Sequence, residues 1–261
     1  MKWFGQHIDD LTVWESIPTA FQEVILEWRN EKTYITAKTS GSTGIPKTIQ
    51  LEKSEVTASV LLTASAFGIV RGATILHNLP VQFIAGKVML IRALVNDWNV
   101  IYVEPSVSFK IPEVDINFAA FTPLQLSALI QFQHERLNQI ETMIIGGGEV
   151  SVELKQQIQS LQGRVFATYG MTETITHIAW SDLKEANLHN WFTPIKGVSV
   201  SSSPESTLTI QAKHLGDRII QTNDLVEIDA TGRFRICGRV DFIINSGGLK
   251  VNPIMLEEAL N

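Results

Sequence analysis

The sequence predicts an α/β fold with a mostly parallel sheet flanked by helices, joined to a smaller antiparallel β unit. Between residues 74 and 168, short runs of aliphatic and β-branched residues alternate with helix-length segments, which is typical of a parallel sheet. After about residue 195, short strand-like runs follow one another with only turns between them. The 261 residues, 44% of them hydrophobic, are enough for one large core or two smaller ones.

The N-terminal part predicts helices on either side of two short strands. Residues 1–30 are expected to form a peripheral helical segment, because apolar residues from Phe21 to Trp28 recur at positions i, i+3, i+4 and i+7. Residues 34–37 and 48–51 are rich in β-branched residues and are expected to be strands. Ser54 is the expected N-cap of a helix that ends near residue 67.

The central part predicts alternating strands and helices. Strands are expected at 74–76, 100–103, 117–121, 142–145 and 165–168, and helices at 85–97, 123–134 and 151–163. Pro123 suits the first turn of its helix, Ser151 is the expected cap of the last one, and Gly163 its expected end.

The C-terminal part predicts short antiparallel strands. Residues 199–206 are rich in serine and are expected to form a loop. Strands are then expected at 208–210, 218–220, 225–228 and 233–236, with a hairpin turn at 230–232.

Composition excludes several classes of function. The net charge is −6 and no run of Lys and Arg builds a basic stripe, so we expect no nucleic-acid partner. No apolar run is long enough to span a membrane, and the N-terminus lacks the apolar core of a signal peptide. Cys237 is the one cysteine, so no intramolecular disulfide forms. We therefore expect a cytoplasmic protein.

Residues 39–47 carry the most informative motif, with four hydroxyl side chains, two glycines and a lysine in nine positions. A glycine-rich turn between two strands can direct backbone N–H groups and hydroxyls at one anion, and Lys47 adds a point charge. A Walker loop has a different spacing and opens a helix, so this is another kind of phosphate loop. The alternative interpretation is a polar hairpin turn.

Two further motifs follow strands of the expected parallel sheet, where such sheets bind ligands. Residues 146–148 are three glycines, followed by Glu149, and would let the backbone approach a flat base closely; a flexible turn is the alternative. In residues 167–174, Tyr169 offers a ring for stacking, Thr172 a hydroxyl for a phosphate, and Glu173 an oxygen ligand for Mg²⁺. Taken alone, Tyr169 would be a core aromatic residue.

The last motif combines Asp224 with Arg239. A carboxylate in such a turn can accept the two hydroxyls of a ribose, as acidic residues do in dinucleotide sites. Asp224 alone would be an ordinary turn residue, and Arg239 could lie on the same ribose or pair with a surface acid.

Taken in order, these motifs resemble those of the adenylate-forming superfamily, which includes acyl-CoA synthetases, adenylation domains and luciferases. Residues 238–253 also match the superfamily's hinge, and the resemblance runs from about residue 33 to the end of the chain. Residues 79–86, 146–148 and 168–174 are most similar to o-succinylbenzoate–CoA ligases of menaquinone synthesis. The resemblance implies a division into an α/β core (1–195), a small β subdomain (196–238), and a hinge with the start of a C-terminal domain (239–261).

The resemblance implies a two-step reaction with ATP, Mg²⁺ and CoA. A carboxylate attacks ATP to form an acyl-adenylate, and the CoA thiol then displaces AMP. The implied catalytic residues are Lys47, Thr172 and Glu173, with Glu173 also the metal ligand and Asp241 the hinge. The implied nucleotide-binding residues are Thr39, Ser40, Gly41, Ser42, Thr43, Gly44, Lys47, Gly147, Gly148, Glu149, Tyr169, Gly170, Thr172, Asp224 and Arg239.

The acyl site is expected among Phe83, Gly86, Lys87, Arg92, Thr168 and His177. o-Succinylbenzoate has a second carboxylate, which needs a cationic partner when buried. Lys87 and Arg92 are five residues apart on the expected helix, so they lie about 140° from one another and do not share a face. We expect Arg92 to be that partner; a surface arginine is the alternative. Phe83 stands where many relatives have histidine, and for His177 a structural role is the alternative.

The chain departs from the superfamily at both ends. Relatives carry a further subdomain before the phosphate loop and a C-terminal lid with a catalytic lysine. We therefore expect this chain to bind ATP or AMP but to adenylate poorly on its own. The alternatives are another aryl- or acyl-CoA ligase, a nucleotide-binding module impaired without the lid, and a phosphate-binding scaffold. Titration with ATP, AMP and an acyl-adenylate analogue separates them.

Overall fold

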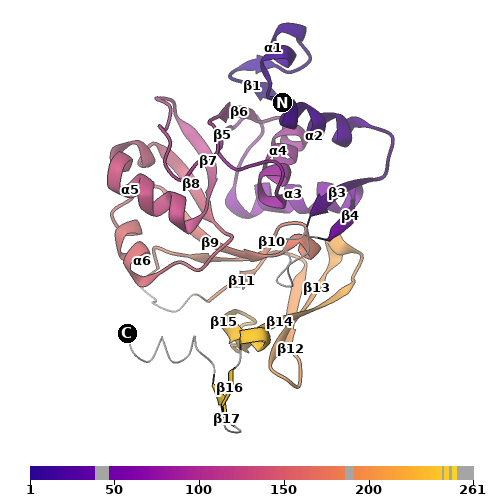
Figure 1. The fold of residues 1–261 in the computed structure, drawn as a ribbon, viewed down its shortest axis with the longest axis vertical. Helices are drawn as coiled ribbons and strands as arrows, with labels where there is room; N and C mark the ends of the chain where they lie inside the picture. The colour runs from indigo at the N-terminus through magenta and orange to yellow at the C-terminus, as the bar shows by residue number, and fades with distance from the viewer. Residues whose placement is uncertain (39–46, 186–190, 243, 247–248, 252–261) are drawn as a thin grey trace.

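The predicted fold class is confirmed by the computed structural model, which describes residues 1–38, 47–185, 191–242, 244–246 and 249–251 (Figure 1). A nine-stranded sheet forms the centre of the molecule, and a four-stranded antiparallel sheet lies beside it. Two short hairpins, β3 (Tyr34–Lys38) with β4 (Thr48–Glu52) and β16 (Ile244–Ser246) with β17 (Leu249–Val251), form separate two-stranded sheets.

The central sheet has the strand order β11-β10-β9-β8-β7-β5-β6-β1-β2. Its strands are β1 (Lys2–Trp3), β2 (Gln6–His7), β5 (Thr74–His77), β6 (Asn99–Tyr102), β7 (Ile116–Phe121), β8 (Ile140–Ile145), β9 (Arg164–Gly170), β10 (His177–Asp182) and β11 (Thr193–Pro194). Strands β1, β6, β5, β7, β8 and β9 run parallel, while β2, β10 and β11 are antiparallel additions at the edges. The carboxyl ends of the parallel strands therefore share one edge.

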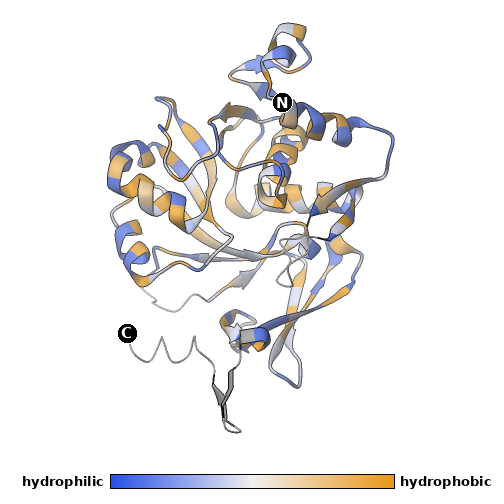
Figure 2. Cartoon of the chain, in the orientation of Figure 1, coloured by the Kyte–Doolittle hydropathy of each residue, from blue (hydrophilic) through white to orange (hydrophobic). Residues whose placement is uncertain are grey.

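Helices cover both faces of this sheet. The helices are α1 (Leu11–Ser16), α2 (Thr19–Arg29), α3 (Lys53–Phe67), α4 (Ile84–Asn96), α5 (Pro123–Leu137) and α6 (Val152–Ile158). Successive strand residues face opposite layers: Ile75 packs in one core with α2, α3 and α4, and Leu76 in the other with α5 and α6. The helices accordingly carry hydrophobic and hydrophilic stripes (Figure 2).

Helix ends followed the expected signals in part. The Ser151 hydroxyl accepts from Leu154 N, and Thr122 and Gln125 form a capping box on either side of Pro123, as N-cap chemistry favours. The expected cap at Ser54 was wrong: α3 begins at Lys53, and Ser54 lies inside its first turn. The expected end at Gly163 was also wrong, because α6 ends at Ile158 and Gly163 lies against the backbone of Ile140 instead.

The antiparallel sheet contains β12 (Val198–Ser202), β13 (Thr207–Ala212), β14 (Ile219–Ile228) and β15 (Phe234–Arg239). The serine-rich loop expected at 199–206 was wrong over 199–202, because these residues belong to β12 and pair along β13. Val198 and Val200 pack toward the cores, and serines alternate with them. The strands expected at 218–220 and 225–228 are one strand, β14, that continues through a register shift against β13.

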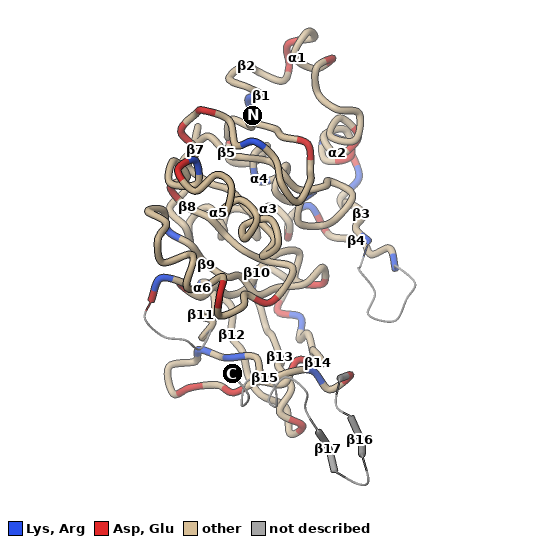
Figure 3. The backbone as a smooth tube through the Cα atoms, turned by 60° about the vertical axis from the view of Figure 1, so that its left-hand side comes forward, with Lys and Arg blue, Asp and Glu red and all other residues tan. Residues whose placement is uncertain are grey.

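Charged residues are spread along the described chain. In Figure 3, Lys and Arg positions are interspersed with Asp and Glu positions, without one continuous basic stripe among the described residues. Within the part of the chain that the structure describes, none of the helices has the length and apolar character needed to cross a bilayer.

His77 makes stability depend on pH. Its Nε2–H donates to Gly86 O (3.0 Å), and full burial lowers its pKa to about 4. In the unfolded chain this histidine titrates near pH 6.5. Between about pH 4 and 6.5 the unfolded chain therefore binds a proton that the folded chain excludes, so the free energy of unfolding decreases as the pH is lowered. From pH 7.5 to 5, wild type is expected to lose about 2 kcal/mol more than His77→Gln in urea unfolding. Equal losses in the two proteins would contradict this.

Candidate functional site

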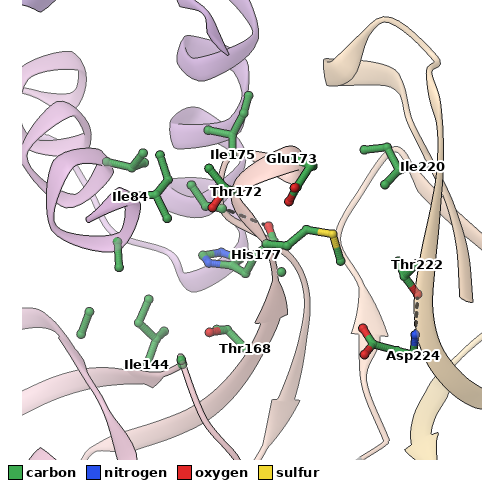
Figure 4. A pocket seen from close by; sticks show the side chains of 18 of the residues that line it. Ile84, Ile144, Thr168, Thr172, Glu173, Ile175, His177, Ile220, Thr222 and Asp224 are labelled. Atoms are coloured by element: carbon green, nitrogen blue, oxygen red, sulfur yellow. Dashed lines mark hydrogen bonds between the residues drawn. The ribbon is translucent and has the colours of Figure 1, made fainter. Parts of the chain in front are cut away.

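A cleft of about 730 Å³ lies at the carboxyl edge of the parallel strands, between the central sheet and β14. Its walls come from α4, from the ends of β7, β8 and β9, from the turn after β9, and from β14 and β15. Figure 4 shows Ile84, Ile144, Thr168, Thr172 and His177 on one side and Ile220, Thr222 and Asp224 on the other. Open α/β sheets bind ligands at this edge.

The turn after β9 places two polar side chains in the cleft. η1 (Thr172–Thr174) follows β9 directly, and Thr174 Oγ1 accepts from Met171 N and donates to Thr176 O. Ile175 has φ 68°, a left-handed conformation that is strained for a β-branched residue. These contacts hold Thr172 and Glu173 toward the cleft (Figure 4).

Asp224 is the centre of a hydrogen-bonded group on β14. It is buried, accepts from Tyr169 OH (2.5 Å) and Arg239 Nη1 (3.0 Å), and forms an ion pair with Arg239. Burial and the Asp224 carboxylate raise the pKa of Tyr169 well above its ordinary value, so the phenol keeps its proton. Both carboxylate oxygens of Asp224 thus accept a hydrogen bond from a protein donor.

The Tyr169 ring faces an aromatic cluster. It packs edge-on against Phe234, with ring centroids 5.3 Å apart, and also contacts Phe192. Tyr169 does not belong to the cleft lining found among the described residues. The ring of Tyr169 therefore packs in the aromatic cluster, while its hydroxyl binds Asp224, which lines the cleft.

The apolar end of the cleft contains a buried cation. Arg92 on α4 is 3% exposed, and none of the described carboxylates pairs with it. Its Nε has no hydrogen-bond partner among the described residues, and its Nη1 donates to Met89 Sδ (4.0 Å). Burial lowers the pKa of Arg92 to about 10, so the guanidinium is still charged at neutral pH.

His177 lies at the same end of the cleft. Its Nε2 is 3.3 Å from Thr63 Oγ1, on α3. Burial, then the charge of Arg92, hold the pKa of His177 well below its usual range. The ring is therefore neutral at pH 7, and Arg92 carries the charge. The walls around the two residues are aliphatic: Ile84, Val88, Ala120 and Ile144.

The cleft brings together many of the predicted site residues: Lys47, Arg92, Gly147, Thr168, Gly170, Thr172, Glu173, His177, Asp224 and Arg239. Residues 39–46, with six of the predicted nucleotide-binding residues, lie outside the described residues. Gly148 and Glu149 are not among the described cleft-lining residues. Asp241, in η3 (Val240–Phe242), accepts from Asn223 Nδ2 (3.0 Å) and from Arg239 Nη2 (3.1 Å).

Three residues expected at the acyl site lie elsewhere. Phe83 is 60% exposed, outside the described cleft lining. Gly86 lies so close to Pro80 that a Cβ there would be 2.2 Å from the Pro80 carbonyl oxygen. Lys87 Nζ donates to Glu27 Oε2 and Thr36 O, on the opposite side of α4 from Arg92. The close packing of the turn between β5 and α4 therefore explains why residue 86 is a glycine.

Sequence reasoning missed several cleft residues. Ile220 and Asn223 on β14, Met171, and Thr176 all line the cleft. The alternation of strand residues could have marked Ile220 and Thr222 as sharing one face. The turn residues at 171 and 176 had no such signal, because their orientation depends on how β10 returns beside β9.

The cleft suits a magnesium ion that is held mainly by the phosphates of a bound molecule and by one carboxylate of the protein. Among the described residues there is no group of three or more His, Cys, Asp or Glu arranged around a metal position. Glu173 lies in the cleft and has no ion pair with another described residue. Mg²⁺ ordinarily binds one or two carboxylates together with phosphate oxygens and waters, so a single carboxylate fits.

The fold and the cleft together define an α/β domain with a nucleotide-type site at its sheet edge, and the comparisons with known proteins agree. The AMP-binding enzyme family matches residues 12–201. The chain therefore belongs to the AMP-binding enzyme family. The nine-stranded sheet with its antiparallel units corresponds to the large N-terminal domain of adenylate-forming enzymes.

Two curated relatives show the range of similarity. The chain is 24% identical to 4-chlorobenzoate–CoA ligase of an Arthrobacter species, over 85% of this chain and 50% of that protein. It is 22% identical to 2-succinylbenzoate–CoA ligase of Bacillus subtilis, over 99% of this chain and 60% of that protein. The chain thus spans about half the length of the curated relatives it matches.

Solved structures are similar in fold. An acyl-CoA synthetase (AMP-forming)/AMP-acid ligase II-like protein from Dyadobacter fermentans has a TM-score of 0.79 at 29% identity, covering 95% of this chain and 74% of that one. O-succinylbenzoate coenzyme A synthetase from Bacillus subtilis, in complex with ATP and magnesium, has a TM-score of 0.75 at 20% identity, covering 86% and 54%.

Proposed function

We propose that this chain takes part in the ATP-dependent activation of a carboxylic acid as an acyl-adenylate, followed by transfer of the acyl group to CoA. We propose o-succinylbenzoate as the acid. The observation that carries this choice is Arg92, a buried guanidinium without a described carboxylate partner at the apolar end of the cleft. A buried charge of this kind is costly unless a ligand pairs with it. A substrate with a second carboxylate supplies that partner.

In the first step, a carboxylate oxygen of the acid bonds to the α-phosphorus of ATP, and the bond to pyrophosphate breaks. Negative charge develops on phosphate oxygens, so donors and cations placed at the cleft stabilise the transition state. Thr172 would donate to the α-phosphate and Lys47 would neutralise the departing phosphates. Mg²⁺, held by Glu173, would supply Lewis-acid stabilisation of the same charge.

The nucleotide would lie along β14 and the end of β9. Asp224 would accept the ribose hydroxyls beside Arg239, and Gly147 would leave room for the base. In the second step, the CoA sulfur would bond to the acyl carbon, and the bond to AMP would break. We also propose that residues 239–261 lead into the lid domain and that Asp241 is the hinge.

The second candidate is activation of an aromatic monocarboxylate. The similarity to a 4-chlorobenzoate–CoA ligase and the aliphatic walls around His177 favour it. Such an acid would leave the guanidinium of Arg92 unpaired in the complex.

Titration of acyl-adenylate analogues tests the proposal. We expect the o-succinylbenzoyl sulfamoyl adenosine to bind this chain roughly a hundredfold more tightly than the benzoyl analogue, because a lost charge pair at a buried site costs about 3 kcal/mol. Isothermal titration calorimetry with both analogues, and with AMP and ATP·Mg²⁺ as references, measures the difference. Equal affinity for the two analogues would favour the monocarboxylate, and failure of every nucleotide to bind would exclude the enzyme class.

A further inference from the structure

The hairpin that brackets the phosphate motif has a free strand edge. Among the described strands, β3 and β4 pair with one another and with no other strand. Lys53 N donates to Thr33 O, so the ladder hydrogen bonds continue at every second pair and the pair Thr36 with Gln50 carries none. The N–H and C=O groups of Thr36 therefore face away from β4.

Two charged side chains take the place of the neighbouring strand. Glu27 Oε1, from α2, accepts from Thr36 N (2.8 Å) and Thr36 Oγ1 (2.7 Å). Lys87 Nζ, from α4, donates to Thr36 O (2.9 Å). Carboxylate and ammonium thus supply the acceptor and the donor that the next strand would otherwise offer.

The two charges also pair with each other. Lys87 Nζ is 2.8 Å from Glu27 Oε2, and the side chains are 14% and 24% exposed. Burial raises the pKa of Glu27, but the donors from Lys87 and Thr36 outweigh it, so the pKa lies below its ordinary value. Each polar atom of the junction has a partner, which is the condition for a half-buried ion pair to hold a fixed geometry.

The junction joins the two halves of the cleft. β3 ends at Lys38, directly before the motif of residues 39–47, and Lys47, which lines the cleft, directly precedes β4. α4 carries Lys87 on one side and Arg92, at the acyl end of the cleft, on the other. A shift of the β3–β4 hairpin against α4 would change the distance between the phosphates of a nucleotide bound near Lys47 and an acid bound near Arg92.

We propose that Glu27 and Lys87 are positioning residues that hold the phosphate-motif hairpin at a set distance from the acyl wall. The inference rests on the proposed function. It predicts a selective defect: ligands that reach the motif through β- and γ-phosphates lose affinity, while AMP, which ends at the α-phosphate, does not. Correct alignment of reacting groups depends on sub-ångström placement, so the adenylation rate falls as well.

The test compares Lys87→Met, Glu27→Gln and the charge-conserving Lys87→Arg by calorimetry with ATP·Mg²⁺ and AMP. We expect Lys87→Met and Glu27→Gln to weaken ATP roughly tenfold, as loss of charge-assisted hydrogen bonds implies, with AMP within about twofold of wild type. Lys87→Arg is expected to restore most of the ATP affinity. Arg233→Met is the matched control, because it breaks a partly buried ion pair with Asp229 in the turn between β14 and β15.

The outcomes separate the inference from the proposed function. If wild type binds ATP and the variants lose ATP and AMP equally, or lose neither, the positioning role is overturned. Melting temperatures of the four variants identify a general loss of folding, and Glu27→Gln, which keeps the shape of the side chain, is the milder probe. If wild type binds neither nucleotide, the proposed function itself fails.

Discussion

Replacing Arg92 with methionine is expected to remove recognition of a diacid while the protein keeps or gains stability. The guanidinium is 3% exposed and has no carboxylate partner among the described residues. Removing the cation that pairs with the substrate's second carboxylate at a buried site costs about 3–5 kcal/mol, which corresponds to roughly 100-fold to 4,000-fold weaker binding. Removing an uncompensated buried charge in the unliganded protein is favourable, because its desolvation has no compensation there.

Two measurements check this expectation. Affinity for the o-succinylbenzoyl analogue is measured by calorimetry, and the free energy of unfolding by urea titration. AMP affinity should be unchanged, because Arg92 lines the cleft from α4, whereas Asp224 lines it from β14. Arg71→Met is the matched control, since Arg71 is an exposed arginine paired with Asp97. A variant that is destabilised and still selects the diacid would show that Arg92 is a structural residue.

Replacing Gly170 with alanine is expected to damage both the fold and the nucleotide site. A Cβ at this position would lie 2.3 Å from the Thr176 carbonyl oxygen and 2.5 Å from His177 Cα. Both contacts are backbone atoms of the segment that pairs with β9, so they cannot rotate away. Overpacking of this kind costs about 3 kcal/mol and would lower Tm by roughly 5–10 °C.

The same substitution would move the turn that carries Thr172 and Glu173. We therefore expect AMP and ATP affinity to fall together, and circular dichroism melting with calorimetry measures both effects. Gly148→Ala is the control for stability, because its Cβ would meet only Pro123 side-chain atoms at 3.5 Å or more. Wild-type melting and binding in Gly170→Ala would contradict the close packing of β9 on β10.

Much of the fold followed from local patterns. The buried strands from 74 to 168 and their helices were predicted in type and order, because aliphatic runs and helical spacing are local signals. β10 was missed, since its buried residues follow a motif that had been interpreted only as a binding turn. Residues 199–202 were assigned to a loop because of their serines, whereas their pairing with β13 depends on partners 6 to 12 positions away along the chain.

The site was predictable where one short segment supplies several groups. Thr172, Glu173 and Gly170 lie in one turn, so their sequence spacing was enough to place them together. The expected ring stacking of Tyr169 remains a prediction, and in this structure its ring faces Phe234. Lys87 carries the charge expected at an acyl site, yet its position on α4 turns it toward the hairpin.

By itself, the sequence determined the chemistry of this protein: hydroxyls, glycines and a lysine suited to phosphates, and a parallel sheet to present them. Those properties come from neighbours along the chain. Only the tertiary structure decided which charges share the cleft, because the deciding contacts join distant residues. Tyr169 meets Asp224 across 55 residues, and Lys87 meets Glu27 across 60. Of the two cations on α4, the packing of the helix buries Arg92 in the lining of the cleft and pairs Lys87 with Glu27.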